Sequence, residues 1–204
     1  MLEVQRYLAD HSLDDLKREF SISHKRHNKY NNLVLLSYDQ INSPFTEKIV
    51  CECRGLILDE ANNYKIVCFP FTKFFNHLES NAAKLDLTDF KVYEKIDGSI
   101  LTLYYYDHNW HVSTSGTPDA ECEINDFNIS FKELFWEQFK NQSFSLENFS
   151  TDTCYMFELT SKYNKVVVNH NQSLTLIGAR NLLNNKELSE NDLKHLNVPF
   201  AKEF

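Results

Sequence analysis

The sequence predicts an α+β fold, built mostly of antiparallel strands with a few flanking helices. Short apolar runs are separated by turn residues, as at Asn62-Asn63 and at residues 107–109, and this pattern is typical of hairpins. Helical spacing occurs in only three places. Each of these is preceded by a serine that can cap a helix: Ser12, Ser130 and Ser189.

Length and charge limit the classes of function. The 204 residues are enough for one substantial core, or for one core with a small satellite. The net charge of −8 argues against a broad nonspecific coat for nucleic acid, but it leaves room for a local basic cleft. No apolar run approaches the ~20 residues that a membrane span needs. The N-terminal residues also lack a signal-peptide pattern, so no membrane partner is expected.

The cysteines and histidines show no metal-site pattern. Cys51-Glu52-Cys53 has the wrong spacing for a zinc knuckle and suits one face of a strand. His108 and His111 have no second ligand pair at metal-site spacing, so we expect both at the surface. The five scattered cysteines, an odd number, are most simply explained by a reducing, cytoplasmic compartment.

The first third of the chain predicts one helix and three strands. Ser12 caps the helix, whose apolar side carries Leu13, Leu16 and Phe20. Residues 25–32 are polar and predict a loop with a small basic cluster, Lys25, Arg26 and Lys29, or simply a solvated surface. Strands are expected at residues 33–38, 49–59 and 64–69.

The strand expected at residues 49–59 contains Arg54 and Gly55 in its middle. An arginine within an apolar strand must face solvent, pair with an acid or hold a ligand. The glycine beside it indicates that something approaches the backbone there.

Lys73 lies among aromatic residues and a proline, in the stretch from Phe69 to Asn76. Two interpretations are equally open. The lysine either packs on the rings at the surface through cation–π contacts, or it binds phosphate inside a walled pocket.

The most informative stretch is Lys95-x-Asp97-Gly98-Ser99, which interrupts an apolar, strand-like context. Phe90 and Val92 precede it, and the strand expected at residues 100–106 follows it. Lysine is a covalent nucleophile when nearby cations or desolvation favour the neutral amine. A solvated turn at a strand end is the plainer interpretation, because Asp-Gly is a common hairpin signal.

The remaining elements complete the α+β pattern. A second hairpin strand is expected at residues 110–114, and Ser130 with Glu133 makes a capping box for a helix. The strand at residues 155–160 carries one acid, Glu158, at its centre. Two more strands and a last helix are expected at residues 165–168, 174–178 and 190–196.

Four motifs together resemble the covalent nucleotidyltransferase superfamily of ligases and capping enzymes. They are Arg54-Gly55, Lys73-Phe74-Phe75-Asn76, Lys95-x-Asp97-Gly98-Ser99 and Phe157-Glu158-Leu159. Residues 161–168 and 174–181 are further similar to the phage-type RNA ligase 1 family. The resemblance extends over roughly residues 30–185, and it implies the fold of a ligase adenylation domain.

The resemblance implies an ATP-dependent RNA ligase that acts in RNA repair. Lys95 would attack the α-phosphorus of ATP, release pyrophosphate and form lysyl-adenylate. The AMP would pass to an RNA 5′-phosphate, and a 3′-hydroxyl would then seal the strand and free AMP. Such chemistry relies on positioning and on neutralising charge, so cations are expected near the phosphates.

The resemblance also implies roles for individual residues. Arg54 and Lys73 match residues that contact the nucleotide, Glu158 matches the acid that holds the ribose hydroxyl, and Phe75 is expected to flank the adenine. The complete nucleotide-binding set is Arg54, Lys73, Phe75, Glu94, Asp97, Gly98 and Glu158, with Asp97 also expected to help place the metal. Mg²⁺ is implied because ATP is used as its metal complex, and no side chain is assigned as a metal ligand.

The sequence departs from the family pattern in two places. Ser115, in Thr114-Ser115-Gly116-Thr117, stands where the family carries a functional lysine. Between Arg180 and Phe204 nothing resembles the family's later Glu-Gly motif or its final lysine motif. We therefore expect residues 1–204 to form a single adenylation domain that is incomplete at its C-terminal end.

Two other functions remain as alternatives. One is a nucleotide- or RNA-end-binding module that keeps the pocket without the chemistry, which Ser115 and the acidic net charge favour. The other is a capping guanylyltransferase, against which the contexts of Arg54 and Lys73 argue. The family suggests RNA ends as the partner, with a broken tRNA anticodon loop as one candidate, and the sequence leaves the oligomeric state open.

Overall fold

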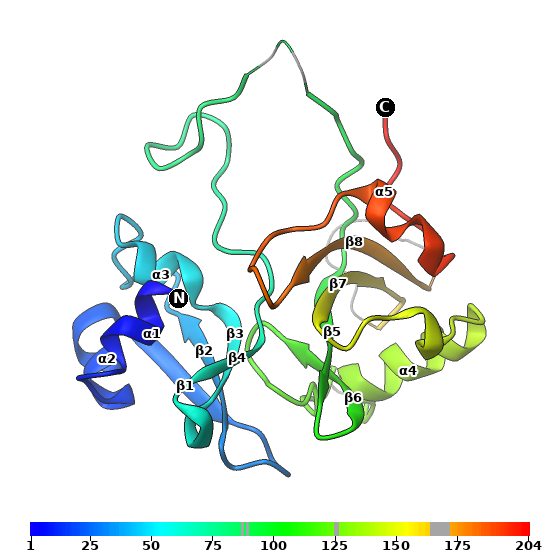
Figure 1. Cartoon of the computed structure of the whole chain (residues 1–204). Helices are drawn as coiled ribbons and strands as arrows, with labels where there is room; N and C mark the ends of the chain where they lie inside the picture. Colours follow the sequence, from blue (N-terminus) through cyan, green and yellow to red (C-terminus); the bar gives the residue numbers. More distant parts are fainter. Residues whose placement is uncertain (87, 89, 125–126, 164–171) are drawn as a thin grey trace.

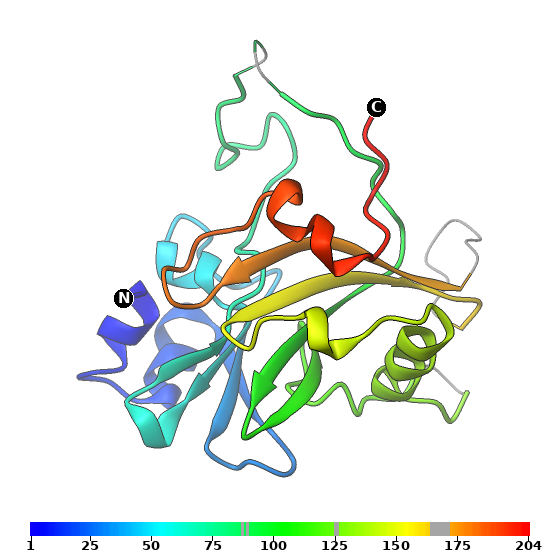
Figure 2. The same cartoon turned by 45° about the vertical axis from the view of Figure 1, so that its right-hand side comes forward.

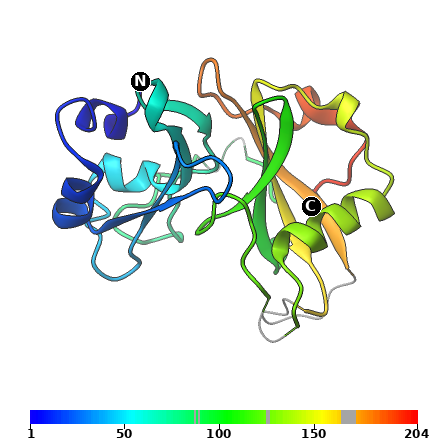
Figure 3. The same ribbon diagram turned by 90° about the horizontal axis from the view of Figure 1, so that it is seen from below.

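Two four-stranded antiparallel sheets lie side by side and carry the short helices on their outer faces (Figures 1 and 3). The computed structural model describes residues 1–204 except 87, 89, 125–126 and 164–171. The predicted α+β class, with mostly antiparallel sheets, is confirmed. Among the described residues, no helix is long and apolar enough to cross a membrane.

The first sheet has the strand order β1-β2-β3-β4 and is built by the N-terminal third of the chain. Helices α1, α2 and α3 pack on it, and their apolar residues share one core with β2 and β3. The strands are β1 (Ile22–Arg26), β2 (Leu33–Tyr38), β3 (Arg54–Asp59) and β4 (Lys65–Cys68). The helices are α1 (Glu3–Tyr7), α2 (Leu13–Phe20), α3 (Lys48–Glu52) and the 3₁₀ turn Glu60–Asn62.

The second sheet has the order β6-β5-β7-β8, with β5 and β7 in its centre. Its strands are β5 (Ser99–Tyr106), β6 (Asn109–Thr114), β7 (Thr153–Thr160) and β8 (Ser173–Asn181). Helix α4 (Phe131–Asn141) lies against one face, together with α5 (Glu190–Leu193) and the 3₁₀ turn Lys194–Leu196. A further 3₁₀ turn, Leu146–Asn148, connects α4 to β7.

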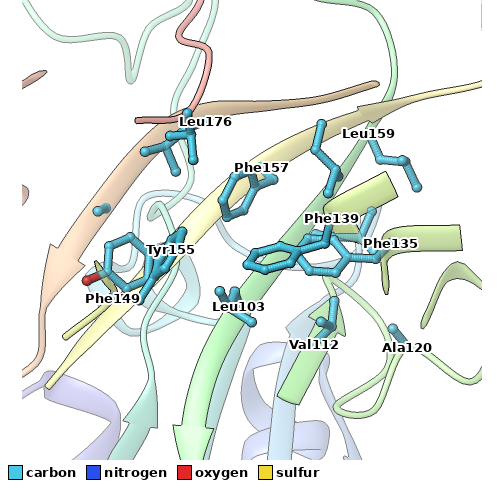
Figure 4. Close-up of a cluster of buried hydrophobic side chains, with 14 of the residues drawn as sticks. Leu103, Val112, Ala120, Phe135, Phe139, Phe149, Tyr155, Phe157, Leu159 and Leu176 are labelled. Atoms are coloured by element: carbon cyan, nitrogen blue, oxygen red, sulfur yellow. The ribbon is translucent and has the colours of Figure 1, made fainter. Parts of the chain in front are cut away.

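Alternation along β7 sorts the side chains between the two faces of this sheet. Tyr155, Phe157 and Leu159 point toward the helices and form a cluster of buried aromatic and aliphatic side chains (Figure 4). Cys154 and Met156 point the other way and pack with Leu35 and Ile57 of the first sheet. Glu158 shares the parity of Met156, so it faces the side on which the two sheets meet.

Most of the predicted elements are confirmed. The helix capped by Ser12 and the helix capped by Ser130 both begin with a capping box. The hairpin turn between β5 and β6 places Asp107 and His108 in the left-handed region, as a tight turn requires. The strand expected at residues 165–168 lies outside the described residues.

The strand predicted at residues 49–59 is wrong over its first half. Residues 48–52 form α3, and the strand begins at Arg54. Ile49, Val50 and Cys53 are all buried, which is the spacing of one helical face. The expectation that Cys51 and Cys53 share one face of a strand is therefore wrong as well.

Three further expectations are corrected. Lys25 and Arg26 belong to the edge strand β1, whose only fully buried residue is Ile22, so the predicted loop begins at His27. His111 is partly buried between the rings of Tyr30 and Tyr104, with ring centroids at 5.4 and 5.5 Å. The residues described just before Lys95 form no regular strand: Tyr93 makes a single isolated bridge, and Phe90 and Val92 are exposed.

Replacing Glu52 with alanine is expected to lower the free energy of unfolding by about 1–3 kcal/mol. The Glu52 side chain is 3% exposed and accepts hydrogen bonds from the backbone N–H groups of Glu3 (3.2 Å) and Val4 (3.0 Å). The alanine leaves these two helix-end donors of α1 without their partner. Urea denaturation measures the change, and the exposed Glu47→Ala variant is the control. Equal effects of the two substitutions would contradict this role of Glu52.

Candidate functional site

A cavity of about 750 Å³ is lined by residues of both sheets. Its walls come from the start of β3, from β5, β7 and β8, from the long segment between β4 and β5, and from α5 with the residues on either side of it. In Figure 2 this long segment rises away from the sheets and returns next to the C-terminal residues. The charged residues of the lining are Arg54, Glu94, Lys95, Glu158, Glu187 and Glu190.

Lys95 lies in the irregular segment just before β5, and its side chain is exposed at the cavity. The backbone of this segment pairs with the C-terminal residues. The N–H of Glu94 donates to the carbonyl of Lys202 (2.8 Å), and the N–H of Phe204 donates to the carbonyl of Val92 (2.9 Å). Between them, Tyr93 and Glu203 form an antiparallel bridge. The segment that carries the candidate nucleophile is thus paired with the C-terminal residues by two hydrogen bonds around a single β-bridge.

Glu158 and Gly98 connect the turn at residues 95–98, which carries the candidate nucleophile Lys95, to the second sheet. The N–H of Gly98 donates to Glu158 Oε1 at 3.0 Å, and the Glu158 side chain is 8% exposed. A Cβ atom on Gly98 would come within 3.0 Å of the carbonyl oxygen of Leu159. Glycine is needed here because the turn passes directly over the backbone of β7.

The environment of Glu158 raises the pKa of its carboxyl group, although not as far as neutral pH. Burial raises the pKa of Glu158 to about 6, and the nearby Asp97 carboxylate raises it as well. The Gly98 N–H and the positive charges of Lys95 and Arg54 act in the opposite direction. At neutral pH the carboxylate is therefore mostly ionised and able to accept hydrogen bonds from a ligand.

Stability should depend on pH through Glu158. Its pKa in the folded protein lies above the ordinary value of 4.5, so the protonated form stabilises the fold. This contribution is complete below pH 4.5 and is lost as the pH rises through 6. Relative to Glu158→Gln, the wild-type free energy of unfolding is expected to fall by roughly 2 kcal/mol from pH 4.5 to pH 7. Urea denaturation of both proteins at the two pH values measures it, and a constant difference would contradict it.

Arg54 opens β3, and its guanidinium lies 4.5 Å from the centre of the Phe74 ring. It makes no salt bridge within the described part of the chain. Gly55 has a left-handed backbone (φ 80°), and a Cβ there would lie 3.1 Å from Cα of Ser115. The predicted close approach at Gly55 is confirmed, and the approaching group is the chain's own backbone.

A smaller cavity of about 220 Å³ adjoins the first at Arg54. Arg54, Phe71 and Ile100 line both cavities. Three residues with hydroxyl side chains also line the smaller cavity: Thr102, Thr114 and Ser115. Ser115 therefore lies close to the Arg54 guanidinium, which has no ion-pair partner among the described residues.

Lys73 and Phe75 lie outside the lining of both cavities. The Lys73 ammonium sits among three rings, with centroid distances of 5.8 Å to Tyr38, 5.3 Å to Phe45 and 5.4 Å to Phe75. The structure therefore shows the cation–π packing that was one of the two interpretations of Lys73. The aromatic residues that line the larger cavity are instead Phe71, Phe74, Tyr93 and Phe200.

Glu94 lines the cavity, and Asp97 lies close enough to Glu158 to raise its pKa. Ile177, Gly178 and Glu187 also line the cavity, and no sequence motif pointed to them individually. Arg180 holds Glu187 there through a 2.7 Å ion pair. Residues 174–181 carry the family resemblance but no charge in an apolar context except Arg180, so their sequence does not predict a place at the cavity.

Comparison with known proteins adds an independent result. The profile of a protein family described as RNA ligase matches residues 52–204. The chain is 35% identical over 195 residues to a bifunctional polynucleotide kinase/RNA ligase of Autographa californica nuclear polyhedrosis virus, covering 86% of this chain and 27% of that protein. It is 29% identical over 163 residues to an RNA ligase of Rhodothermus phage RM378, covering 64% of this chain and 37% of that protein.

The chain thus spans well under half the length of these relatives. Among solved structures it is similar to a Naegleria gruberi RNA ligase with PPi, at 12% identity and a TM-score of 0.43. That match covers 72% of this chain and 51% of the other.

Proposed function

This chain belongs to the RNA ligase family of the phage RNA ligase 1 type, and from this we propose that it is the adenylation domain of an ATP-dependent RNA ligase. The observation that carries the proposal is the convergence of Lys95, Glu158 and Arg54 on one cavity. These residues come from three separate parts of the sequence. A nucleophile, a carboxylate and a guanidinium are the groups that bind and activate a nucleoside triphosphate.

The first step is attack of Lys95 Nζ on the α-phosphorus of ATP. The amine loses its proton, a P–N bond forms, and the bond to pyrophosphate breaks. Arg54 contacts the phosphates, because it lines the cavity and has no ion-pair partner in the described chain. Ionised Glu158 accepts a hydrogen bond from a ribose hydroxyl.

Two further steps join the RNA ends. The AMP moves from Lys95 to an RNA 5′-phosphate, which forms a P–O–P linkage and restores the amine. The 3′-hydroxyl of the other end then attacks the 5′-phosphorus, forms the phosphodiester and releases AMP. RNA ends, with broken tRNA as one candidate, and ATP are thus the proposed substrates.

The metal enters with ATP in this proposal. Within the described ranges no group of three or more His, Cys, Asp or Glu side chains could hold a metal ion. Mg²⁺ bound to the phosphates neutralises part of their charge, while the protein's own residues supply the nucleophile and the contacts to the nucleotide. A reducing, cytoplasmic compartment is part of the proposal, as the odd number of scattered cysteines predicts.

Incubation with α-labelled ATP or GTP and Mg²⁺, followed by a denaturing gel, tests the proposal. Label from ATP that survives denaturation, together with joining of a 5′-phosphorylated RNA, is the expected result. Label from GTP alone would indicate a capping guanylyltransferase. Binding of ATP without covalent label would indicate either that the family's late motifs are needed for adenylylation or that the chain is a nucleotide-binding module.

A further inference from the structure

Gly178 lies within β8 and lines the larger cavity, which Lys95 also lines. A Cβ atom at this position would come within 3.0 Å of two ring atoms of Phe71, Cζ and Cε1. The positive-φ residues of the described chain include Gly55 but not Gly178, so backbone conformation does not demand this glycine. Its role is to leave room for the ring that packs on it.

Phe71 is linked to Arg54 through the ring of Phe74, which contacts both. The Phe71 and Phe74 rings meet edge to face, with centroids 6.3 Å apart and planes at 82°. Phe74 is 60% exposed, so few other groups fix its position. The Arg54 guanidinium lies over the Phe74 ring at 4.5 Å. In the absence of an ion pair in the described chain, this ring is the contact that orients the guanidinium.

We propose that Gly178 is a positioning residue for Arg54, acting through the rings of Phe71 and Phe74. The missing Cβ seats Phe71 against β8, Phe71 supports Phe74, and Phe74 holds the guanidinium at the boundary of the two cavities. The consequence for nucleotide binding rests on the proposed function. The geometric link between Gly178 and Arg54 does not, and it can be measured in the protein without nucleotide.

The test compares four variants with wild type: Gly178→Ala, Phe71→Leu, the double variant, and Gly116→Ala. Leucine lacks the two ring atoms that the new Cβ would meet. Gly116 is the matched control, because a Cβ added there meets nothing within 4 Å. The first readout is the NMR signal of the Arg54 side-chain N–H, assigned with Arg54→Lys, because the Phe74 ring current shifts it. The second is the dissociation constant for ATP.

Gly178→Ala is expected to move the Arg54 signal and to weaken ATP binding roughly tenfold, the effect of one charged hydrogen bond. Because the clash needs the Phe71 ring, the double variant should match Phe71→Leu alone in both readouts, and Gly116→Ala should match wild type. A loss of stability alone would not move the Arg54 signal of the folded protein.

Two results would overturn the inference: an unchanged Arg54 signal in Gly178→Ala, or additive effects in the double variant. Failure of the wild-type chain to bind ATP would count against the proposed function. The Arg54 signal would still decide whether Gly178 positions the guanidinium.

Discussion

Replacing Lys95 with alanine is expected to abolish covalent labelling by ATP, a loss on the order of a thousandfold or more, while ATP binding stays near the wild-type value. The side chain lies at the cavity and is exposed, so its removal leaves the core untouched. The contacts assigned to the nucleotide come from Arg54 and Glu158, which remain in place. Labelling with α-labelled ATP and a binding titration measure the two quantities separately.

Lys84→Ala provides the matched control for Lys95. Lys84 is exposed in the same segment between β4 and β5 and does not line either cavity. This variant is expected to label as wild type does. Full labelling of Lys95→Ala would show that another residue is the nucleophile, and equal losses in both variants would show that the segment responds to any change of charge.

Replacing Gly98 with alanine is expected to reduce labelling by roughly a hundredfold, because the turn that carries Lys95 must move. The new Cβ would clash with the carbonyl oxygen of Leu159, which is backbone within a sheet and cannot rotate away. The shift also separates the Gly98 N–H from Glu158 Oε1. The strain is expected to lower the free energy of unfolding by about 1–3 kcal/mol.

Gly116→Ala again separates the effect of the site from the effect of adding a methyl group. Labelling rates at saturating ATP and urea denaturation are compared for the two alanine variants and wild type. If Gly98→Ala is labelled as fast as Gly116→Ala, then the close packing of the Gly98 turn on β7 does not position Lys95.

The strands were predictable where their turns were local. Asp107 and His108 mark a tight turn, and the apolar run from Tyr155 to Leu159 marks a strand that carries one acid, Glu158. Helix α3 was not predicted because the apolar pattern of Ile49, Val50 and Cys53 is compatible with a short buried strand as well as with one helical turn. Only the packing of α3 on the first sheet decides between the two.

Lys95, Glu158 and Arg54 could be chosen in advance because each is a charge in an apolar context. The aromatic wall could not be chosen in the same way. The segment from Phe71 to Phe75 has no regular period, so nothing in the sequence tells which ring faces the cavity. The structure turns Phe71 and Phe74 toward it and leaves Phe75 with Lys73.

The pairing of residues 92–94 with residues 202–204 also sets an order of events during translation. A 2.8 Å salt bridge joins Lys91 to Glu203 beside this pairing, and the two residues are 112 positions apart in the chain. All of the second sheet must leave the ribosome before Tyr93 can meet Glu203. Contacts of such long sequence separation form late in folding. Lys95, the proposed nucleophile, is therefore synthesised well before its segment can pair with Glu203, which requires nearly all of these 204 residues to have emerged.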